Sequence, residues 1–289
     1  MNFTTNKIRD IRETYLKELK KLYPENESAA FLDLIIEKRL GINRLKRLSS
    51  PDLRISESEI LKIHFDVREL KKHRPIQYIL GESQFLDLNL MVNENVLIPR
   101  PETEELVLWI VENEKPKKNL FILDIGTGSG CIALSLKQLI PESKIWACDL
   151  SEEALKVASQ NATKNHLEVN FFKTNILQEV IPDLLPSLDI IVSNPPYVTE
   201  AEKAQMQFNV LDFEPPDALF VKNEDPLIYY RNICRLAASK LKPGGRLYFE
   251  INQKYGKEVT DIMKSAGFKY PVVKKDIFDK NRMVSATWL

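Results

Sequence analysis

The first part of the chain carries apolar residues at helical spacing in three stretches. Within residues 7–23 and 28–40 the apolar positions recur every three or four residues, which places them on one face of a helix. Gly41 follows the second stretch, and glycine commonly ends a helix because it adopts the left-handed conformation without strain. Ser56 opens the third stretch with the spacing of a capping box, and that helix should end before Pro75. We therefore expect the chain to begin with a small helical bundle.

The period changes from helical to alternating over residues 81–98. Two apolar runs, residues 85–92 and 96–98, flank the polar segment Asn93-Glu94-Asn95. Turn-favouring residues between two alternating runs are typical of a β-hairpin. We expect a two-stranded hairpin with its turn at residues 93–95, which connects the bundle to the rest of the chain without belonging to either core.

From Leu120 onward, short apolar runs alternate with helical stretches. The predicted strands are residues 120–125, 144–148, 169–172, 189–193, 246–251, 270–273 and 283–288. Repeated strand–helix units imply a mostly parallel sheet with right-handed crossovers. The pattern predicts an α/β fold with a Rossmann-like, mostly parallel, seven-stranded sheet. We expect three parts: a helical domain over residues 1–80, a hairpin linker over 81–98 and a sheet domain over 99–289.

Charge is balanced over the whole chain but not within it. The 289 residues include 41 Lys and Arg against 41 Asp and Glu, a net charge of +0. Residues 1–80 hold 17 Lys and Arg against 12 Asp and Glu, which leaves 24 against 29 for the remainder. Proteins that grip long nucleic acids usually show a basic surplus, so we expect no direct nucleic-acid binding. The basic excess at the front fits docking onto an acidic partner, and it also fits an ordinary solvated helix surface.

The cysteines and the apolar runs bear on the compartment. The three cysteines are an odd number without metal-ligand spacing, which indicates a reducing compartment and no metal site. The segment Met1-Asn2-Phe3-Thr4 shows no apolar signal sequence, and no apolar run approaches membrane-spanning length. We expect a soluble, cytoplasmic monomer without membrane contact.

The glycine-rich stretch Gly126-Thr127-Gly128-Ser129-Gly130 follows a predicted strand and opens a helix. Glycines let the backbone pass close to a ligand, and free N–H groups at a helix N-terminus favour a carboxylate or a phosphate. Asp149, at the tip of the next strand, is placed to accept the two hydroxyls of a ribose. Asn175, after the third strand, is equally well a contact to an adenine or a simple loop residue. These features predict a cofactor that contains a nucleoside.

The most informative stretch is Asn194-Pro195-Pro196-Tyr197, which follows a predicted strand. The side-chain oxygen of Asn194 and the carbonyl of Pro195 could accept the two hydrogens of a planar NH₂ group, and proline adds no competing donor. Tyr197 would stack on that group and exclude water. A conjugated nitrogen is a poor nucleophile, and such acceptors would aim its lone pair outward. The stretch predicts methylation of an NH₂ group, although a proline-rich turn that merely ends a strand fits it equally well when taken alone.

Together, the two motifs favour S-adenosylmethionine over a nicotinamide dinucleotide. The loop has the spacing Gly-x-Gly-x-Gly, whereas the dinucleotide fingerprint requires Gly-x-Gly-x-x-Gly. A hydride-transfer enzyme has no need for Asn-Pro-Pro-Tyr, whereas a methyl donor needs an acceptor beside it. We predict catalytic roles for Asn194, Pro195 and Tyr197, with Pro196 completing the substrate-binding segment. The predicted cofactor-binding residues are Gly126, Thr127, Gly128, Ser129, Gly130, Asp149, Asn175 and Asn194.

Arg100 stands between two prolines, in Pro99-Arg100-Pro101, without a local partner. The prolines and the acids that follow are typical of a helix start. A role for Arg100 at the edge of the active site is a second hypothesis.

With these motifs in place, the chain resembles the PrmC/HemK family, the glutamine N5-methyltransferases of class-I peptide-chain release factors, over most of its length. Residues 74–81 resemble the family's junction between bundle and hairpin, and residues 97–104 resemble its Ile-Pro-Arg-Pro-Glu/Asp-Thr-Glu signature. Phe213-Glu214-Pro215 with Ala218-Leu219 resembles a further family stretch. The first two segments are the specific ones, because Asn-Pro-Pro-Tyr is shared with many DNA and RNA methyltransferases.

The resemblance implies a class I S-adenosylmethionine-dependent methyltransferase fold and a methyl transfer to the glutamine of the release factor's Gly-Gly-Gln loop. It also implies that Asn194 and the Pro195 carbonyl hold that amide, that Tyr197 packs against it, and that the front bundle helps to dock the release factor. The chain departs from the family at Asn175-Ile176, where an acid and an aromatic residue are usual, and at Asn252, where glycine is favoured. We expect neither departure to touch the methyl-transfer residues.

Two other functions fit parts of the sequence. A nucleic-acid amino-methyltransferase would present adenine N6, also a planar NH₂ group, to the same residues. The neutral charge and the lack of a long insertion between Tyr197 and the fifth strand speak against it. A nucleotide-binding module without catalysis would bind the cofactor and methylate no acceptor.

Overall fold

The computed structural model describes residues 5–114, 117–178, 185–205 and 208–289, so Met1 to Thr4 lie outside the described residues. The chain forms two units. The smaller comprises Met1–Gly81 and Phe208–Phe213, and the larger comprises Glu82–Gln207 and Glu214–Leu289. Each unit has its own apolar core.

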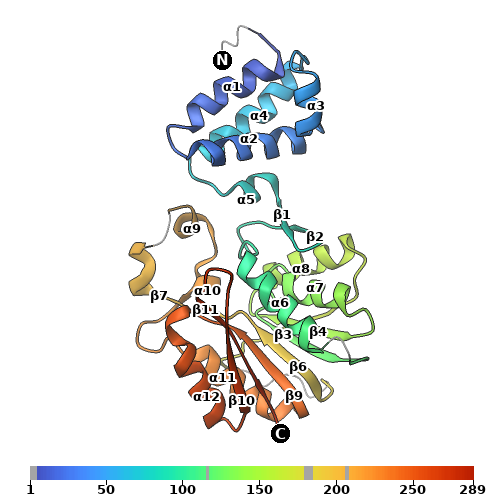
Figure 1. The fold of residues 1–289 in the computed structure, drawn as a ribbon, viewed down its shortest axis with the longest axis vertical. Helices are drawn as coiled ribbons and strands as arrows, with labels where there is room; N and C mark the ends of the chain where they lie inside the picture. Colours follow the sequence, from blue (N-terminus) through green and yellow to red (C-terminus); the bar gives the residue numbers. More distant parts are fainter. Residues whose placement is uncertain (1–4, 115–116, 179–184, 206–207) are drawn as a thin grey trace. The chain divides into compact units, whose positions relative to one another are not determined.

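The smaller unit is a helical bundle, as the apolar spacing predicts (Figure 1). Its helices are α1 (Ile8–Leu19), α2 (Glu25–Leu40), α3 (Arg44–Ser49), α4 (Glu57–Leu70) and α5 (Ile76–Leu80). The capping box at Ser56 forms, because its hydroxyl accepts from the Glu59 amide while the Glu59 carboxylate accepts from the Ser56 amide. Gly41 ends α2 at φ 66°, in the left-handed conformation. Helices α3 and α5 are additional to the three predicted stretches.

The hairpin forms with a different turn from the predicted one. Strands β1 (Glu82–Phe85) and β2 (Leu88–Met91) pair antiparallel, with Phe85 opposite Leu88. The turn therefore lies at Leu86-Asp87 and not at residues 93–95, and residues 96–98 are not a strand. Leu86 adopts φ 47°. A positive φ in a hairpin turn usually falls on glycine or asparagine, so the sequence gives no turn signal at this position. The expectation that the hairpin lies outside both cores is wrong, because Phe85, Leu88 and Leu90 belong to the core of the larger unit.

The larger unit is built on a seven-stranded sheet in the order β10-β11-β9-β6-β3-β4-β5. Its strands are β3 (Phe121–Ile125), β4 (Lys144–Asp149), β5 (Asn170–Lys173), β6 (Leu188–Ser193), β9 (Leu241–Glu250), β10 (Lys269–Lys275) and β11 (Asn281–Thr287). The five strands from β9 to β5 run parallel, and β11 pairs antiparallel with both β9 and β10. This confirms the predicted mostly parallel α/β sheet.

Helices cover both faces of this sheet, and the alternation of side chains along each strand divides its residues between two cores (Figure 1). On β3, Ile122 packs with α6 (Pro101–Glu114), α7 (Cys131–Leu139) and α8 (Glu152–Lys164). Its neighbour Leu123 packs with α11 (Ile228–Lys240) and α12 (Gly256–Ser265) on the other face. A sheet buried on both faces explains why its central strands are continuous apolar runs.

The segment between β6 and β9 contains short elements that were not predicted from the sequence. They are β7 (Val198–Thr199), the 3₁₀ helix η1 (Glu200–Gln205), α9 (Phe208–Phe213), α10 (Pro216–Leu219) and β8 (Phe220–Val221), and a second 3₁₀ helix, η2 (Gln253–Tyr255), follows β9. Strands β7 and β8 pair parallel, directly after the Asn-Pro-Pro-Tyr stretch. This pairing fixes the position of the residues directly after the predicted acceptor site.

Candidate active site

The glycine-rich loop lies at the carboxyl end of β3, between that strand and α7. Gly126, Gly128 and Gly130 adopt φ of 74°, 54° and 83°, the left-handed region that favours glycine. The hydroxyl of buried Thr127 donates to the carboxylate of Asp124 at 2.7 Å. Burial raises the pKa of Asp124 to about 7, and the Thr127 hydroxyl acts in the opposite direction. The hydrogen bond between Thr127 and Asp124 therefore fixes the loop to the end of its own strand.

Asp149 lies beside this loop, at the carboxyl end of β4. One of its carboxylate oxygens accepts from the Gly128 amide and the other from the Ser151 amide, both at 2.9 Å. Burial raises the pKa of Asp149, and these two amides act in the opposite direction. The structure thus brings together two of the predicted cofactor-binding elements, the glycine loop and the acid on the next strand.

The residues at this edge fit S-adenosylmethionine. A Cβ added to Gly126 or Gly128 would meet no atom within 4 Å, so the loop backbone borders open space. A carboxylate has about four lone-pair positions, and the two amides occupy two of those of Asp149. Acceptor capacity therefore remains for the two hydroxyls of a ribose.

Asn175 follows β5 at the same edge and next to Asp149. The Thr174 amide donates to the Asp149 carbonyl at 3.0 Å, which places the segment beside β4. The side-chain oxygen of Asn175 accepts from the Leu177 amide at 3.0 Å, so it organises its own turn. A loop role, which is one of the two predictions for Asn175, accounts for that contact. The other prediction, a contact to an adenine, would have to use the NH₂ group of Asn175.

The Asn-Pro-Pro-Tyr stretch begins directly after β6, the neighbour of β3. Ser193 pairs with Ile125, and its hydroxyl donates to the Ile125 carbonyl at 2.8 Å. The next residues along the two strands are Asn194 and Gly126, so the Asn-Pro-Pro-Tyr stretch and the glycine loop leave the sheet side by side. Ligands of open α/β sheets bind at this edge.

Two side chains from distant parts of the sequence, those of Thr103 and Glu250, support Asn194 and Tyr197. The Asn194 NH₂ group donates to the Thr103 hydroxyl at 3.2 Å, and that hydroxyl donates to the Glu250 carboxylate at 2.6 Å. The Tyr197 hydroxyl donates to the other oxygen of Glu250 at 3.0 Å. Thr103 and Glu250 were not among the predicted site residues. Glu250 could have been suspected from its place at the end of a strand, but nothing in the sequence pairs it with Thr103.

Asn252 also contacts this stretch. Its NH₂ group lies 3.3 Å from the Tyr197 carbonyl and 3.2 Å from the Glu202 carboxylate. The expectation that the change from glycine at this position leaves the methyl-transfer residues untouched is therefore wrong. A glycine would have no side chain to make either contact, so Asn252 adds a hydrogen bond to the backbone of Tyr197.

Arg100 finds its partner 114 positions along the chain. Its guanidinium donates to the Glu214 carboxylate at 2.5 Å, and the other Glu214 oxygen accepts from the Ile98 amide at 3.3 Å. The Glu214 side chain is buried, and burial raises its pKa while the charge of Arg100 acts in the opposite direction. These two bonds to Glu214 connect the start of α6 to the stretch that precedes α10. Arg100 therefore has a structural role.

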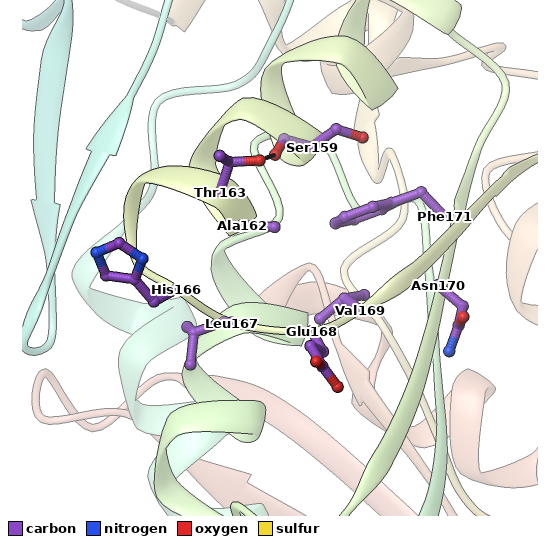
Figure 2. Close-up of a pocket in the computed structure, with 9 residues that line it drawn as sticks. All are labelled: Ser159, Ala162, Thr163, His166, Leu167, Glu168, Val169, Asn170 and Phe171. Atoms are coloured by element: carbon purple, nitrogen blue, oxygen red, sulfur yellow. Dashed lines mark hydrogen bonds between the residues drawn. The ribbon is translucent and has the colours of Figure 1, made fainter.

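A separate groove lies at the opposite edge of the sheet, where α8 ends and β5 begins (Figure 2). It has a volume of about 680 Å³ and is lined in part by His166, Asn170 and Phe171. In Figure 2 the Thr163 hydroxyl is bonded to the Ser159 carbonyl, at 3.0 Å, along the helix wall of the groove. None of the predicted site residues lines this groove, so it plays no part in the site described above.

The described part of the chain shows neither a metal-binding cluster nor a membrane-spanning helix. Within it, no group of three or more His, Cys, Asp and Glu side chains is arranged to hold a metal ion. Of the helices described, none has both the length and the apolar character that crossing a membrane requires.

The seven-stranded, mostly parallel sheet, with a glycine loop after β3, an acid at the end of β4 and Asn-Pro-Pro-Tyr after β6, is that of a class I S-adenosylmethionine-dependent methyltransferase. Residues 104–219 match the family model described as the methyltransferase small domain. A solved methyltransferase structure from Pyrococcus furiosus shares the fold, with a TM-score of 0.52 and 16% identity over 70% of this chain and 89% of that one.

The comparisons with known sequences identify the family within this class. Residues 10–81 match the model described as the PrmC N-terminal domain. The chain is 45% identical to the release factor glutamine methyltransferase of Flavobacterium psychrophilum, over 97% of this chain and 99% of that protein. It is 44% identical to the one of Bacteroides thetaiotaomicron, over 94% and 97%. The chain belongs to the family of release factor glutamine methyltransferases.

Proposed function

We propose that this protein transfers a methyl group from S-adenosylmethionine to the side-chain amide nitrogen of the glutamine in the Gly-Gly-Gln motif of class-I release factors. The observation that carries the proposal is the Asn-Pro-Pro-Tyr stretch beside the cofactor loop, in a chain 45% identical to a release factor glutamine methyltransferase. When bound, S-adenosylmethionine supplies an electrophilic methyl group on its sulfonium.

In this proposal the chain holds the acceptor amide by its two hydrogens. The side-chain oxygen of Asn194 and the carbonyl of Pro195 each accept one N–H, and Tyr197 packs on the flat amide and excludes water. Pro196 keeps the segment rigid because its φ is fixed. Each acceptor contributes roughly 0.5–1.5 kcal/mol, so the pair supplies about ten- to hundredfold in rate. The larger part of the acceleration comes from holding the nitrogen in line with the methyl group.

For the cofactor we propose that the backbone of the stretch Gly126-Thr127-Gly128-Ser129-Gly130 receives the charged amino-acid end, that Asp149 accepts the ribose hydroxyls and that Asn175 contacts the adenine. Asn194 borders both ligands. Both the glycine φ values and the open space beside the loop support this assignment.

We propose the domain roles on the same basis. Residues 1–80 dock the release factor, residues 81–98 connect the two domains, and residues 99–289 carry out the methyl transfer. The reaction takes place in the cytoplasm, where translation factors act. The proposal has the enzyme act as a monomer and without binding nucleic acid directly. The basic surplus of residues 1–80 supports a docking role for that part.

A crossed pair of variants tests the proposal, with mass spectrometry of a purified release factor after incubation with enzyme and S-adenosylmethionine. Asn194→Ala should abolish the mass gain of one methyl group and leave cofactor affinity largely intact. Asp149→Ala should weaken cofactor binding first. DNA and RNA are offered as acceptors in parallel. Methylation of either nucleic acid in place of the release factor, or cofactor binding without turnover on any acceptor, would refute the proposed function.

A further inference from the structure

The carboxylate of Glu250 sits at the end of a chain of hydrogen bonds that leads to Asn194. Glu250 is the last residue of β9, Thr103 lies in the first turn of α6, and Asn194 follows β6. Strands β6 and β9 are paired neighbours, with Ser193 opposite Phe249, which brings their carboxyl ends together. Glu250 is 1% exposed and Thr103 2%, so water does not compete for the bond between these two side chains.

The direction of each bond in this chain follows from the chemistry of its end group. An ionised carboxylate can only accept hydrogen bonds, so the Thr103 hydroxyl must donate its single hydrogen to Glu250. That hydroxyl then offers only lone pairs to Asn194. The planar amide of Asn194 must therefore turn its NH₂ group toward Thr103, as the 3.2 Å contact has it, and its oxygen away.

We infer that Thr103 and Glu250 are positioning residues that set which end of the Asn194 amide faces the acceptor nitrogen. This inference rests on the proposed function, in which the oxygen of Asn194 accepts a hydrogen of the substrate amide. An asparagine amide is nearly symmetric in shape, so packing alone selects weakly between its two orientations, whereas the wrong orientation presents a donor to a donor. The second oxygen of Glu250 fixes the Tyr197 hydroxyl at the same time.

The surroundings of Glu250 suit a group that only accepts. Among the ion pairs of the described residues none includes Glu250, so both of its oxygens stay available to hydroxyl donors. Burial raises the pKa of Glu250, while the hydroxyls of Thr103 and Tyr197 and the charge of Arg282 act in the opposite direction. The bonds that orient Asn194 and Tyr197 are thus also the ones that favour the ionised carboxylate.

The test compares Thr103→Val with Thr103→Ser in the full-length enzyme, with a purified release factor as acceptor. Valine has nearly the shape of threonine but no hydroxyl, and serine keeps the hydroxyl. We expect Thr103→Val to lower kcat about tenfold or more and Thr103→Ser to stay within about twofold of wild type. The KM for S-adenosylmethionine and its affinity by calorimetry should not change in either variant, because Thr103 is not among the residues proposed to hold the cofactor.

A double-mutant cycle separates positioning from a general loss of packing. Thr103→Val added to a slow Asn194→Ser variant should cost little more, because the group that it orients is already gone. Glu250→Gln gives a second probe if Thr103→Val fails to bind the cofactor. Its NH₂ group forces either Thr103 or Tyr197 to reverse its hydrogen bond, so kcat should fall with cofactor affinity unchanged.

The outcomes distinguish this inference from the proposed function. A wild-type enzyme that does not methylate the release factor overturns both. An active wild type with Thr103→Val and Glu250→Gln both as fast as Thr103→Ser overturns the inference alone. Equal and additive losses in the Asn194→Ser background would also overturn it, because they would show that Thr103 acts independently of Asn194.

Discussion

Gly128 combines a left-handed backbone with open space on the side where a Cβ would stand. Gly128→Ala should therefore cost about 1–2 kcal/mol in backbone strain and should also place a methyl group in the space proposed for the cofactor. We expect a clear loss of affinity for S-adenosylmethionine by calorimetry, with a small drop in melting temperature.

Gly244 provides the matched control for this substitution. It lies at φ 82°, is also free of neighbours around its Cβ position, and stands near the start of β9, away from the cofactor loop. Gly244→Ala should lower the melting temperature by a similar amount without changing cofactor affinity. Equal affinities in the two variants would mean that the space beside Gly128 is not the cofactor site.

At the residue scale, the sequence revealed the side chains that make up local motifs but not those that support them. The glycine loop, Asp149 and Asn-Pro-Pro-Tyr could be predicted because each is a short segment at the end of a buried strand. Thr103 and Glu250 stand 147 positions apart and meet only because α6 packs beside β9. Such a contact depends on the finished fold, and no spacing in the sequence encodes it.

At the scale of elements, one buried side chain connects α8 with the hairpin and with the glycine loop. Asn161 is 0% exposed; its oxygen accepts from the Met91 amide at 2.6 Å, and its NH₂ group donates to the carbonyls of Met91 and Ser129. Asn161→Ala would leave these backbone groups unsatisfied in the interior. We expect a loss of about 3 kcal/mol or more in the free energy of unfolding, measured with denaturant.

Asn165, the C-cap residue of α8, is a suitable control for this prediction and lies one helical turn beyond Asn161. Its side chain makes a single bond, to the Asn161 carbonyl at 2.9 Å, and is only half-buried. Asn165→Ala should cost about 1 kcal/mol or less. A similar cost for both variants would show that the link to the hairpin and the loop adds little stability.

The predicted elements agree best with the structure where burial dictates the pattern. The central strands are apolar on both faces, and α8 begins at Ser151, a residue type that favours helix N-caps, whose hydroxyl accepts from the Ala154 amide. Helix α3 was not predicted, because it buries none of its residues and so has no apolar stripe. The hairpin turn was placed wrongly because the strong turn signal at residues 93–95 lies just beyond the strands.

The bundle is stabilised in part by one nearly buried ion pair between α2 and α4. The guanidinium of Arg39 donates to both carboxylate oxygens of Asp66, at 2.6 and 3.0 Å, and to the Ile79 carbonyl. The Asp66 side chain is 10% exposed and that of Arg39 30%, so water weakens the pair only in part. Asp66→Ala should cost the bundle about 2–3 kcal/mol, because it removes the carboxylate that accepts two hydrogen bonds from the Arg39 guanidinium.

The positions of the tryptophans make this loss measurable within one unit. The three tryptophans, Trp109, Trp146 and Trp288, all belong to the larger unit. Asp66→Ala should therefore shift the loss of helix seen by far-ultraviolet circular dichroism to lower denaturant, and leave the tryptophan fluorescence transition in place. Fluorescence that moves together with the dichroism would show that the two units unfold as one.

At the scale of the whole molecule, the bundle and the sheet unit share no core residues, and charge is distributed unevenly between them. The bundle's core consists of residues from α1 to α5 and their connections, and the sheet's two cores contain none of them. The surplus of basic residues falls within residues 1–80, whereas the remainder is acidic by five charges. A division of this kind allows the bundle to bind a protein partner while the larger unit carries out the chemistry.

Reversing charges on the bundle tests this division of roles. Arg44, Lys46 and Lys62 are exposed on α3 and α4, and all three changed to Glu should raise the KM for the release factor about fivefold or more. The kcat and the affinity for S-adenosylmethionine should not change, because the substituted side chains belong to the other unit. The effect should shrink as salt is added, since exposed charges are screened over about 10 Å at 0.1 M.

The matched control reverses three exposed lysines of the larger unit, Lys257, Lys264 and Lys269, so that the total charge changes equally. If docking depends on the bundle, this triple variant should keep the wild-type KM at every salt concentration. An equal rise in KM for both triples would mean that only the net charge of the enzyme matters to the release factor. A wild-type KM in the bundle triple would instead place docking on uncharged surfaces, because a basic surface that contributes to binding cannot be reversed without cost.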